Sequence, residues 1–110
     1  MNSDNIMPID HYHRRFRSRT EAERWHNLVD AALRGDIHSL RAQVKFELIP
    51  AVPELKLGEL SYIADFVYVT KDGETVVEDA RNYKRGAAIQ LFKAKQKLMY
   101  SRYGLYVRRV

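Results

Sequence analysis

The chain has 110 residues, of which 45% are hydrophobic and 30% charged, and a formal net charge of +5, as is ordinary for one globular domain. It contains no cysteine, which excludes a disulfide framework and any metal site built on thiolates. No apolar run approaches the ~20 residues of a membrane-spanning helix, and the N-terminus lacks the apolar core of a signal peptide. We therefore expect a cytoplasmic protein that does not contact membranes.

The positive charge is concentrated near the two ends of the chain. Residues 11–19, HYHRRFRSR, form one basic block, and every charged residue in the segment 82–110 is Lys or Arg. Such segregation suits a polyanionic partner, above all nucleic acid, although a solvated basic surface gives the same pattern. The candidate phosphate contacts are Arg14, Arg15, Arg17, Arg19, Lys84, Arg85, Lys93 and Lys97.

The first half of the chain predicts a tail, a helix and a strand. Residues 1–14 show no periodicity and are expected to be a flexible basic tail, whereas residues 15–110 are expected to form a single domain. Ser18 and Glu21 have the spacing of a capping box, and apolar residues then repeat at helical intervals up to Gly35. Alternating apolar residues from Leu40 to Leu48 predict a half-buried strand.

The second half predicts a hairpin, a helix and a final strand. Two apolar segments, from Leu60 to Val69 and from Glu74 to about Arg81, flank a Lys-Asp-Gly turn. A helix is expected over roughly 87–102, and LYVRRV at the C-terminus reads as a strand. The order predicts an α/β fold with an αβββαβ core, in which two helices flank a four-stranded mixed sheet.

The hairpin carries acids where apolar residues are expected. If residues 71–73 form a three-residue loop with Gly73 in the left-handed conformation, Asp65 faces Asp79 across the two strands. A two-residue loop would place Asp79 opposite Phe66 instead. Arg81 then lies on the face of Asp79, and Glu78 lies on the reverse face as an ordinary ion-pairing residue.

Two opposed carboxylates repel each other unless a cation lies between them. A divalent metal ion with oxygen ligands resolves that conflict, and a nearby cationic side chain can stabilise charge that develops on a phosphate. The alternative for Asp65 is a buried acid paired with an arginine, and for Glu21 it is helix capping alone. Gln43 on the first strand is either close to this site or simply solvated.

The segments YIADF and VVEDAR resemble the core signature of the PD-(D/E)xK nuclease superfamily. That signature has an Asp on one strand, followed on the next strand by Asp or Glu, any residue and Lys. Over roughly 16–110 the chain also resembles a small phage-associated family of uncharacterised nuclease-like proteins. The resemblance implies a restriction-endonuclease-like fold and a Mg²⁺-dependent deoxyribonuclease, encoded by a phage or mobile element and acting in the cytoplasm of a bacterial host.

Carried over residue by residue, the resemblance implies that Asp65 and Asp79 bind Mg²⁺ or Mn²⁺, with Glu21 and the main-chain carbonyl of Ala80 as further ligands. Arg81 stands where the superfamily has its catalytic lysine, and arginine keeps the charge but cannot act as a base. Either Lys84 or Lys93 takes over the role of that lysine, or the activity is weak or lost.

Three functions remain open at this point. The first is a metal-dependent DNA endonuclease that acts on branched or processed DNA or as a homodimer, since so small a chain covers little duplex. The second is a degenerate nuclease fold that binds nucleic acid without cutting it. The third is a protein-interaction module of a phage or mobile element.

Overall fold

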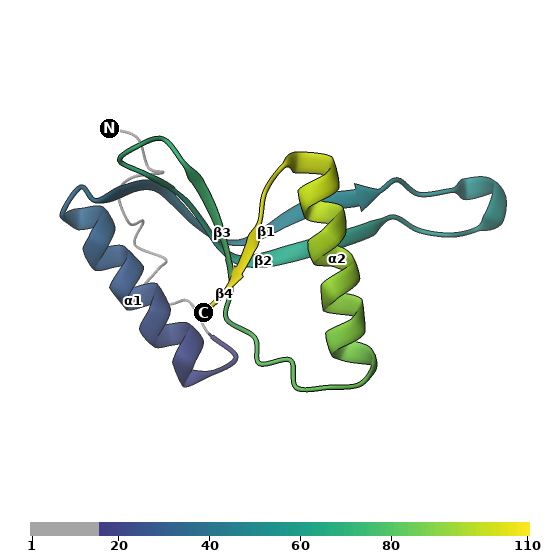
Figure 1. Ribbon diagram of the computed structural model, residues 1–110, viewed down its shortest axis with the longest axis horizontal. Helices are drawn as coiled ribbons and strands as arrows, with labels where there is room; N and C mark the ends of the chain where they lie inside the picture. The colour runs from purple at the N-terminus through teal and green to yellow at the C-terminus, as the bar shows by residue number, and fades with distance from the viewer. Residues whose placement is uncertain (1–15) are drawn as a thin grey trace.

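The structure is a computed structural model that describes residues 16–110 (Figure 1). Its elements are α1 (Arg19–Leu33), β1 (Ile37–Ile49), a short 3₁₀ turn (Pro53–Leu55), β2 (Leu60–Thr70), β3 (Thr75–Asp79), α2 (Ala87–Tyr103) and β4 (Val107–Arg109). The strands lie in the order β1-β2-β3-β4, and β3 and β4 are parallel whereas the other neighbours are antiparallel. The predicted α/β fold, with its αβββαβ order and mixed sheet, is confirmed. The predicted tail of residues 1–14 lies outside the described residues.

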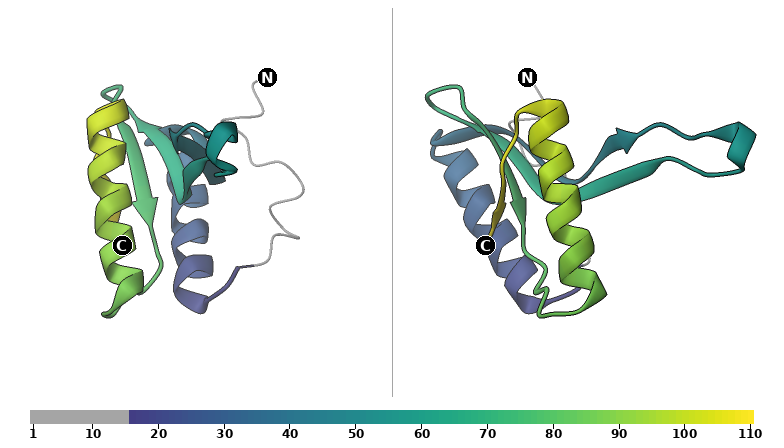
Figure 2. Two further views of the ribbon diagram at one scale, coloured as in Figure 1. Left: turned by 90° about the vertical axis from the view of Figure 1, so that its right-hand side faces the viewer. Right: turned by 45° about the vertical axis from the view of Figure 1, so that its right-hand side comes forward.

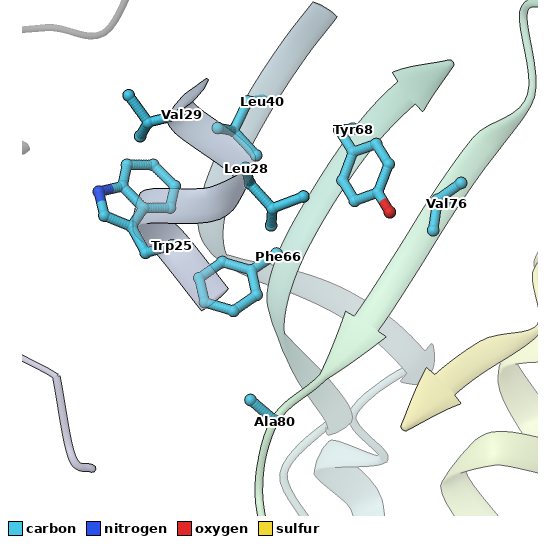
Figure 3. Packing of buried hydrophobic residues seen from close by; sticks show 8 residues of the cluster. All are labelled: Trp25, Leu28, Val29, Leu40, Phe66, Tyr68, Val76 and Ala80. Atoms are coloured by element: carbon cyan, nitrogen blue, oxygen red, sulfur yellow. The ribbon is translucent and has the colours of Figure 1, made fainter. Parts of the chain in front are cut away.

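The two helices cover opposite faces of the sheet. In β3 the neighbours Val76 and Val77 belong to different clusters, because successive side chains of a strand point to opposite sides. The cluster under α1 consists of Trp25, Leu28, Val29, Leu40, Phe66, Tyr68, Val76 and Ala80 (Figure 3). The cluster under α2 consists of Leu48, Tyr62, Ala64, Val67, Val77, Phe92, Met99 and Val107. Full burial of one large apolar side chain stabilises the fold by roughly 1.5–3 kcal/mol, so these two layers hold the sheet between the helices.

The hairpin between β2 and β3 has the register that a three-residue loop requires. The backbone N–H of Thr70 donates to the carbonyl of Glu74 at 2.9 Å, and Gly73 has a φ of 87°. Val67 pairs with Val77, and the same register continued by two residues places Asp65 opposite Asp79. The two-residue loop is therefore excluded, and the predicted register is confirmed as far as Phe66 and Glu78.

The termini of α1 follow its sequence signals. The Ser18 hydroxyl accepts a hydrogen bond from the backbone N–H of Glu21 at 3.1 Å, and Gly35 follows the helix with a φ of 83°. In α2, Phe92 is buried, but Leu91, which the periodicity assigns to the apolar face, is 52% exposed. Among residues 16–110, neither helix has both the length and the apolar composition needed to cross a bilayer.

Strands β1 and β2 run beyond β3 as a two-stranded arm that projects from the rest of the molecule (Figures 1 and 2). The 3₁₀ turn closes the tip of this arm, where the sequence predicts only a loop. β1 also begins earlier than predicted and shifts register between His38 and Arg41, where Ser39 has a φ of 56°. This is a β-bulge, which bends a strand and raises its twist.

Candidate functional site

Two buried carboxylates from different elements meet where α1 begins. Asp65 in β2 is fully buried, and Glu21 in the first turn of α1 is 3% exposed. The Nη2 atom of Arg17 lies 2.7 Å from Oδ1 of Asp65 and 3.4 Å from Oε2 of Glu21. The Nε2 atom of Gln43 lies 3.3 Å from the same two oxygens. We call Glu21 and Asp65 the acid pair; its facing oxygens share two donors and therefore lie close together.

The first turn of α1 explains how Glu21 serves two purposes. Its Oε1 atom accepts a hydrogen bond from the backbone N–H of Arg17 at 2.8 Å, which satisfies a donor just before the helix. Its Oε2 atom remains directed at Asp65 through the shared donors. Capping and participation in the acid site are therefore compatible, and the sequence had left both open.

Gln43 reaches the acid pair from an unusual backbone conformation. It lies in β1 opposite Asp65, since Ala42 pairs with Phe66 and Val44 with Ala64. Its φ is 55°, in the left-handed region that side chains other than Gly rarely adopt. Such a conformation costs on the order of 1 kcal/mol and is common at functional sites, where it redirects a side chain. The sequence could place Gln43 near the site but could not show this conformation.

The two members of the acid pair have different proton affinities. Burial raises the pKa of Asp65 to about 6, the backbone N–H of Ala80 lowers it in part, and the neighbouring Glu21 raises it further. For Glu21, burial acts to raise the pKa, but hydrogen bonds from the Arg17 backbone and from Asp65 outweigh burial, and the pKa is lowered. A proton entering the site therefore goes to Asp65 before Glu21.

Asp79 is also fully buried, but nearby groups donate several hydrogen bonds to its carboxylate. Arg81 donates from Nη2 to Oδ2 at 2.6 Å, from Nε to Oδ1 at 3.2 Å and from its backbone N–H to Oδ1 at 2.8 Å. The hydroxyls of Tyr62 and Tyr83 donate to Oδ2 at 2.7 and 3.3 Å. Burial acts to raise the pKa of Asp79, but the hydrogen bonds from Arg81 and Tyr62 outweigh it, and the pKa is lowered.

Arg81 connects Asp79 with the acid pair. Its Nε atom lies 3.8 Å from Oδ2 of Asp65, and that same oxygen accepts a hydrogen bond from the backbone N–H of Ala80 at 2.7 Å. Arg81 also donates to the carbonyl of Ile63 at 2.8 Å. The predicted alternative for Asp65, a buried acid paired with an arginine, is therefore observed, chiefly with Arg17, whereas its role as a metal ligand stays a prediction.

A cavity of about 600 Å³ opens beside the acid pair. It is lined by Arg17, Ser18, Thr20, Glu21, Ala80, Arg81, Asn82, Arg109 and Val110. Three of these are arginines and only Glu21 is acidic, so the cavity suits an anion. The sequence did not identify Arg109 as a site residue. It belongs to the basic C-terminal segment, but nothing in that segment indicates that β4 places Arg109 at this cavity.

A second cavity of about 270 Å³ shares Arg81 with the first one. It is lined by Ser61, Tyr62, Ile63, Arg81, Tyr83, Ala88, Leu91, Phe92 and Lys95. The sequence named Lys84 and Lys93 as replacements for the missing lysine, and both are exposed, Lys84 after β3 and Lys93 on α2. Lys95 in α2, by contrast, lines this cavity together with Arg81.

The remaining predicted residues have varied positions. Arg19, Arg85 and Lys97 are exposed, and Arg14 and Arg15 lie outside the described residues. Glu78 forms the predicted ion pair on the reverse face, where Arg24 donates to both of its oxygens at 2.8 and 2.6 Å. Within residues 16–110, no group of three or more His, Cys, Asp or Glu side chains is arranged to hold a metal ion.

The fold and this site define an α/β protein with a buried acid pair beside an arginine-lined cavity. A family model described as "Protein of unknown function (DUF1064)" matches residues 4–108, and the chain belongs to that family. Searches of curated proteins and of solved structures found no match.

Proposed function

We propose that the protein is a metal-dependent nuclease that hydrolyses phosphodiester bonds in DNA. The observation that carries the proposal is the buried acid pair, Glu21 and Asp65, of which Glu21 lines a cavity that three arginines also line. Buried carboxylates with perturbed pKa values beside a cavity are typical of functional sites.

The donors at this site fit Mg²⁺ or Mn²⁺. Carboxylate and carbonyl oxygens are the ligands that these hard cations prefer, and Asp65, Glu21 and the carbonyl of Ala80 would supply them. When bound, such an ion lowers the pKa of a water and neutralises charge on a phosphate. Asp79, which the sequence also proposed as a ligand, would have to release Arg81 to take part, because both of its oxygens are bonded by that residue.

The arginines would bind and orient the substrate. Arg81 and Arg109 line the cavity and stay charged at any physiological pH, so they can hold a phosphate and stabilise the additional charge of its transition state. Neither can act as a base. Lys95 lines the second cavity together with Arg81. It is therefore a better candidate than Lys84 or Lys93 for the role of the superfamily's lysine.

The wider setting of this proposal is supported by the basic composition and by the resemblance to nuclease-like phage proteins. The partner is DNA, in branched or processed form or bound by a homodimer, inside a bacterial host that carries a phage or mobile element. The exposed cations Arg19, Lys84, Arg85, Lys93 and Lys97 provide further contacts to the DNA backbone.

A cleavage assay tests this function. Supercoiled, linear and branched DNA are incubated with the protein in Mg²⁺, Mn²⁺ or EDTA. We expect metal-dependent nicking that falls about 100-fold or more in Asp65→Asn and Glu21→Gln, since a metal site contributes several kcal/mol to lowering the barrier. Asp36→Asn is the matched control, because Asp36 is an exposed acid that pairs with Arg34 and Lys71. Equal cleavage by all four proteins would contradict the proposal.

The second candidate is a protein that binds nucleic acid without cutting it. It is favoured by one observation: Arg81 stands in the position of the catalytic lysine and binds Asp79 through three hydrogen bonds. In that case the protein retards DNA in a salt-dependent manner and cleaves it in no metal. An absence of retardation at low salt would instead favour the protein-interaction module.

A further inference from the structure

We infer that Arg17 is an internal counter-ion that holds the acid pair in the metal-free protein and must leave before a metal ion binds, which couples metal binding to nucleic-acid binding. The inference rests on the proposed function, because it assigns the acid pair to a divalent cation. It differs from the sequence-based role of Arg17, which was a simple phosphate contact.

The position of Arg17 is that of a competitor for the site. A single nitrogen, Nη2, contacts Oδ1 of Asp65 at 2.7 Å and Oε2 of Glu21 at 3.4 Å. A metal ion that binds both carboxylates needs those same facing oxygens, at ~2.0–2.6 Å. Two cations cannot share that space, so the guanidinium and the ion exclude each other.

Arg17 is also the cation at this site that can leave at least cost. Its side chain is 56% exposed, whereas that of Arg81 is 29% exposed. Arg81 is further fixed by the carbonyl of Ile63 and by three hydrogen bonds to Asp79. Within residues 16–110, the side chain of Arg17 forms hydrogen bonds only with the acid pair. The bond from its backbone N–H to Glu21 does not depend on the guanidinium and can stay when the side chain moves.

Nucleic acid offers Arg17 a different partner. Arg17 lines the same cavity as Arg81 and Arg109, so a phosphate in that cavity lies within the reach of its side chain. A bidentate arginine–phosphate contact replaces the bonds that Arg17 loses to the acid pair. Phosphate binding thus vacates the carboxylates, and by linkage a bound metal ion strengthens phosphate binding by the same factor. Without substrate, Arg17 stays on the acid pair and a free metal ion binds weakly.

Titration calorimetry with Mn²⁺ tests the competition on the full chain without nucleic acid. We expect Arg17→Ala to bind Mn²⁺ about tenfold more tightly than wild type, because the competing charge-assisted bonds and a repelling charge are removed. Arg17→Gln, which keeps a neutral donor, should lie in between. Arg34→Ala is the matched control, since Arg34 pairs with Asp36 at the far end of α1, and it should bind as wild type does.

A short phosphorothioate oligonucleotide then tests the coupling without depending on cleavage. In wild type it should tighten Mn²⁺ binding, and in Arg17→Ala it should no longer do so; Asp65→Asn measures the Mn²⁺ that the oligonucleotide itself binds. If Arg17→Ala binds Mn²⁺ no more tightly than wild type, Arg17 is not a competitor and the inference fails alone. If neither protein binds Mn²⁺, the metal-dependent function and the inference both fail.

Discussion

Asp65 and Asp79 face each other on β2 and β3 and are equally buried, yet their surroundings move their pKa values in opposite directions. Asp79 is compensated by Arg81, two residues along the chain, and by two tyrosine hydroxyls. Asp65 instead faces a second carboxylate, Glu21, and relies on the half-exposed Arg17. The charged form of Asp79 is therefore stabilised within the hairpin, whereas the charged form of Asp65 is disfavoured by burial and by its acidic neighbours.

This contrast shows that a motif position does not by itself fix the state of its acid. The sequence resemblance likens both residues to the acidic positions of a nuclease signature, and the hairpin register, continued from Val67 and Val77, relates them across the two strands. They differ in their other neighbours. Asp79 is bound by the buried part of Arg81, whereas Asp65 shares its donors with a second carboxylate, that of Glu21. The same substitution, Asp to Asn, should consequently have different effects at the two positions.

The largest effect on stability is expected for Asp79→Asn. The amide cannot compensate the charge of Arg81, and breaking a buried ion pair costs roughly 3–5 kcal/mol. Because Arg81 keeps some contact with water, we expect a loss of about 2–3 kcal/mol in the free energy of unfolding. Urea denaturation at neutral pH measures this loss, and a loss below about 1 kcal/mol would contradict the structural role of Asp79.

Asp65→Asn should act through pH instead. A carboxyl group with a raised pKa binds its proton more tightly when folded, so its contribution is fully present below the unfolded pKa of ~3.9 and is lost as pH rises through about 6. Relative to Asp65→Asn, wild type should therefore lose roughly 1–3 kcal/mol between about pH 4 and pH 7. Urea denaturation in EDTA across this range provides the measurement. A difference that rises with pH would show that the pKa of Asp65 is lowered.

Arg81→Lys tests the ion pair with Asp79 by changing the cation instead of the acid. An ammonium group cannot reproduce the two side-chain bonds to Asp79 together with the one to the Ile63 carbonyl. We expect a loss of about 1 kcal/mol in the free energy of unfolding, and a smaller loss in the Asp79→Asn background, where the pair is already broken. Fully additive losses in the double variant would indicate that the two residues are not coupled.

The smallest effects are expected on the solvent-exposed face of α2, which takes no part in the surroundings of Asp65 or Asp79. Lys93→Ala and Lys97→Ala each remove one exposed charge, so each should weaken DNA binding a few-fold and reduce the salt dependence of log K by about one unit. Gel retardation at several salt concentrations measures both. Lys71→Ala, in the hairpin loop, is the control, and an equal effect there would mean that α2 has no preferred contact with DNA.

Features that depend on neighbours along the chain could be predicted from the sequence. The Lys-Asp-Gly turn limited the hairpin to two registers, one of which relates Asp65 to Asp79, and the left-handed Gly73 of the structure selects that one. The spacing of Ser18 and Glu21 likewise fixed the start of α1. The order of apolar segments then predicted the αβββαβ fold, since each amphipathic face must be buried against another element.

The surroundings of the acids, in contrast, depend on how distant segments pack together. Arg17 contacts Asp65 although the two residues are 48 positions apart in the sequence. Gln43 contacts Asp65 from a left-handed backbone conformation of its own. Arg109 arrives at the cavity because β4 is parallel to β3. Such contacts depend on the angle at which α1 packs on the sheet and on flexible side chains with many rotamers, so no local pattern encodes them. The charge balance that separates Asp65 from Asp79 is accordingly a property of the assembled fold.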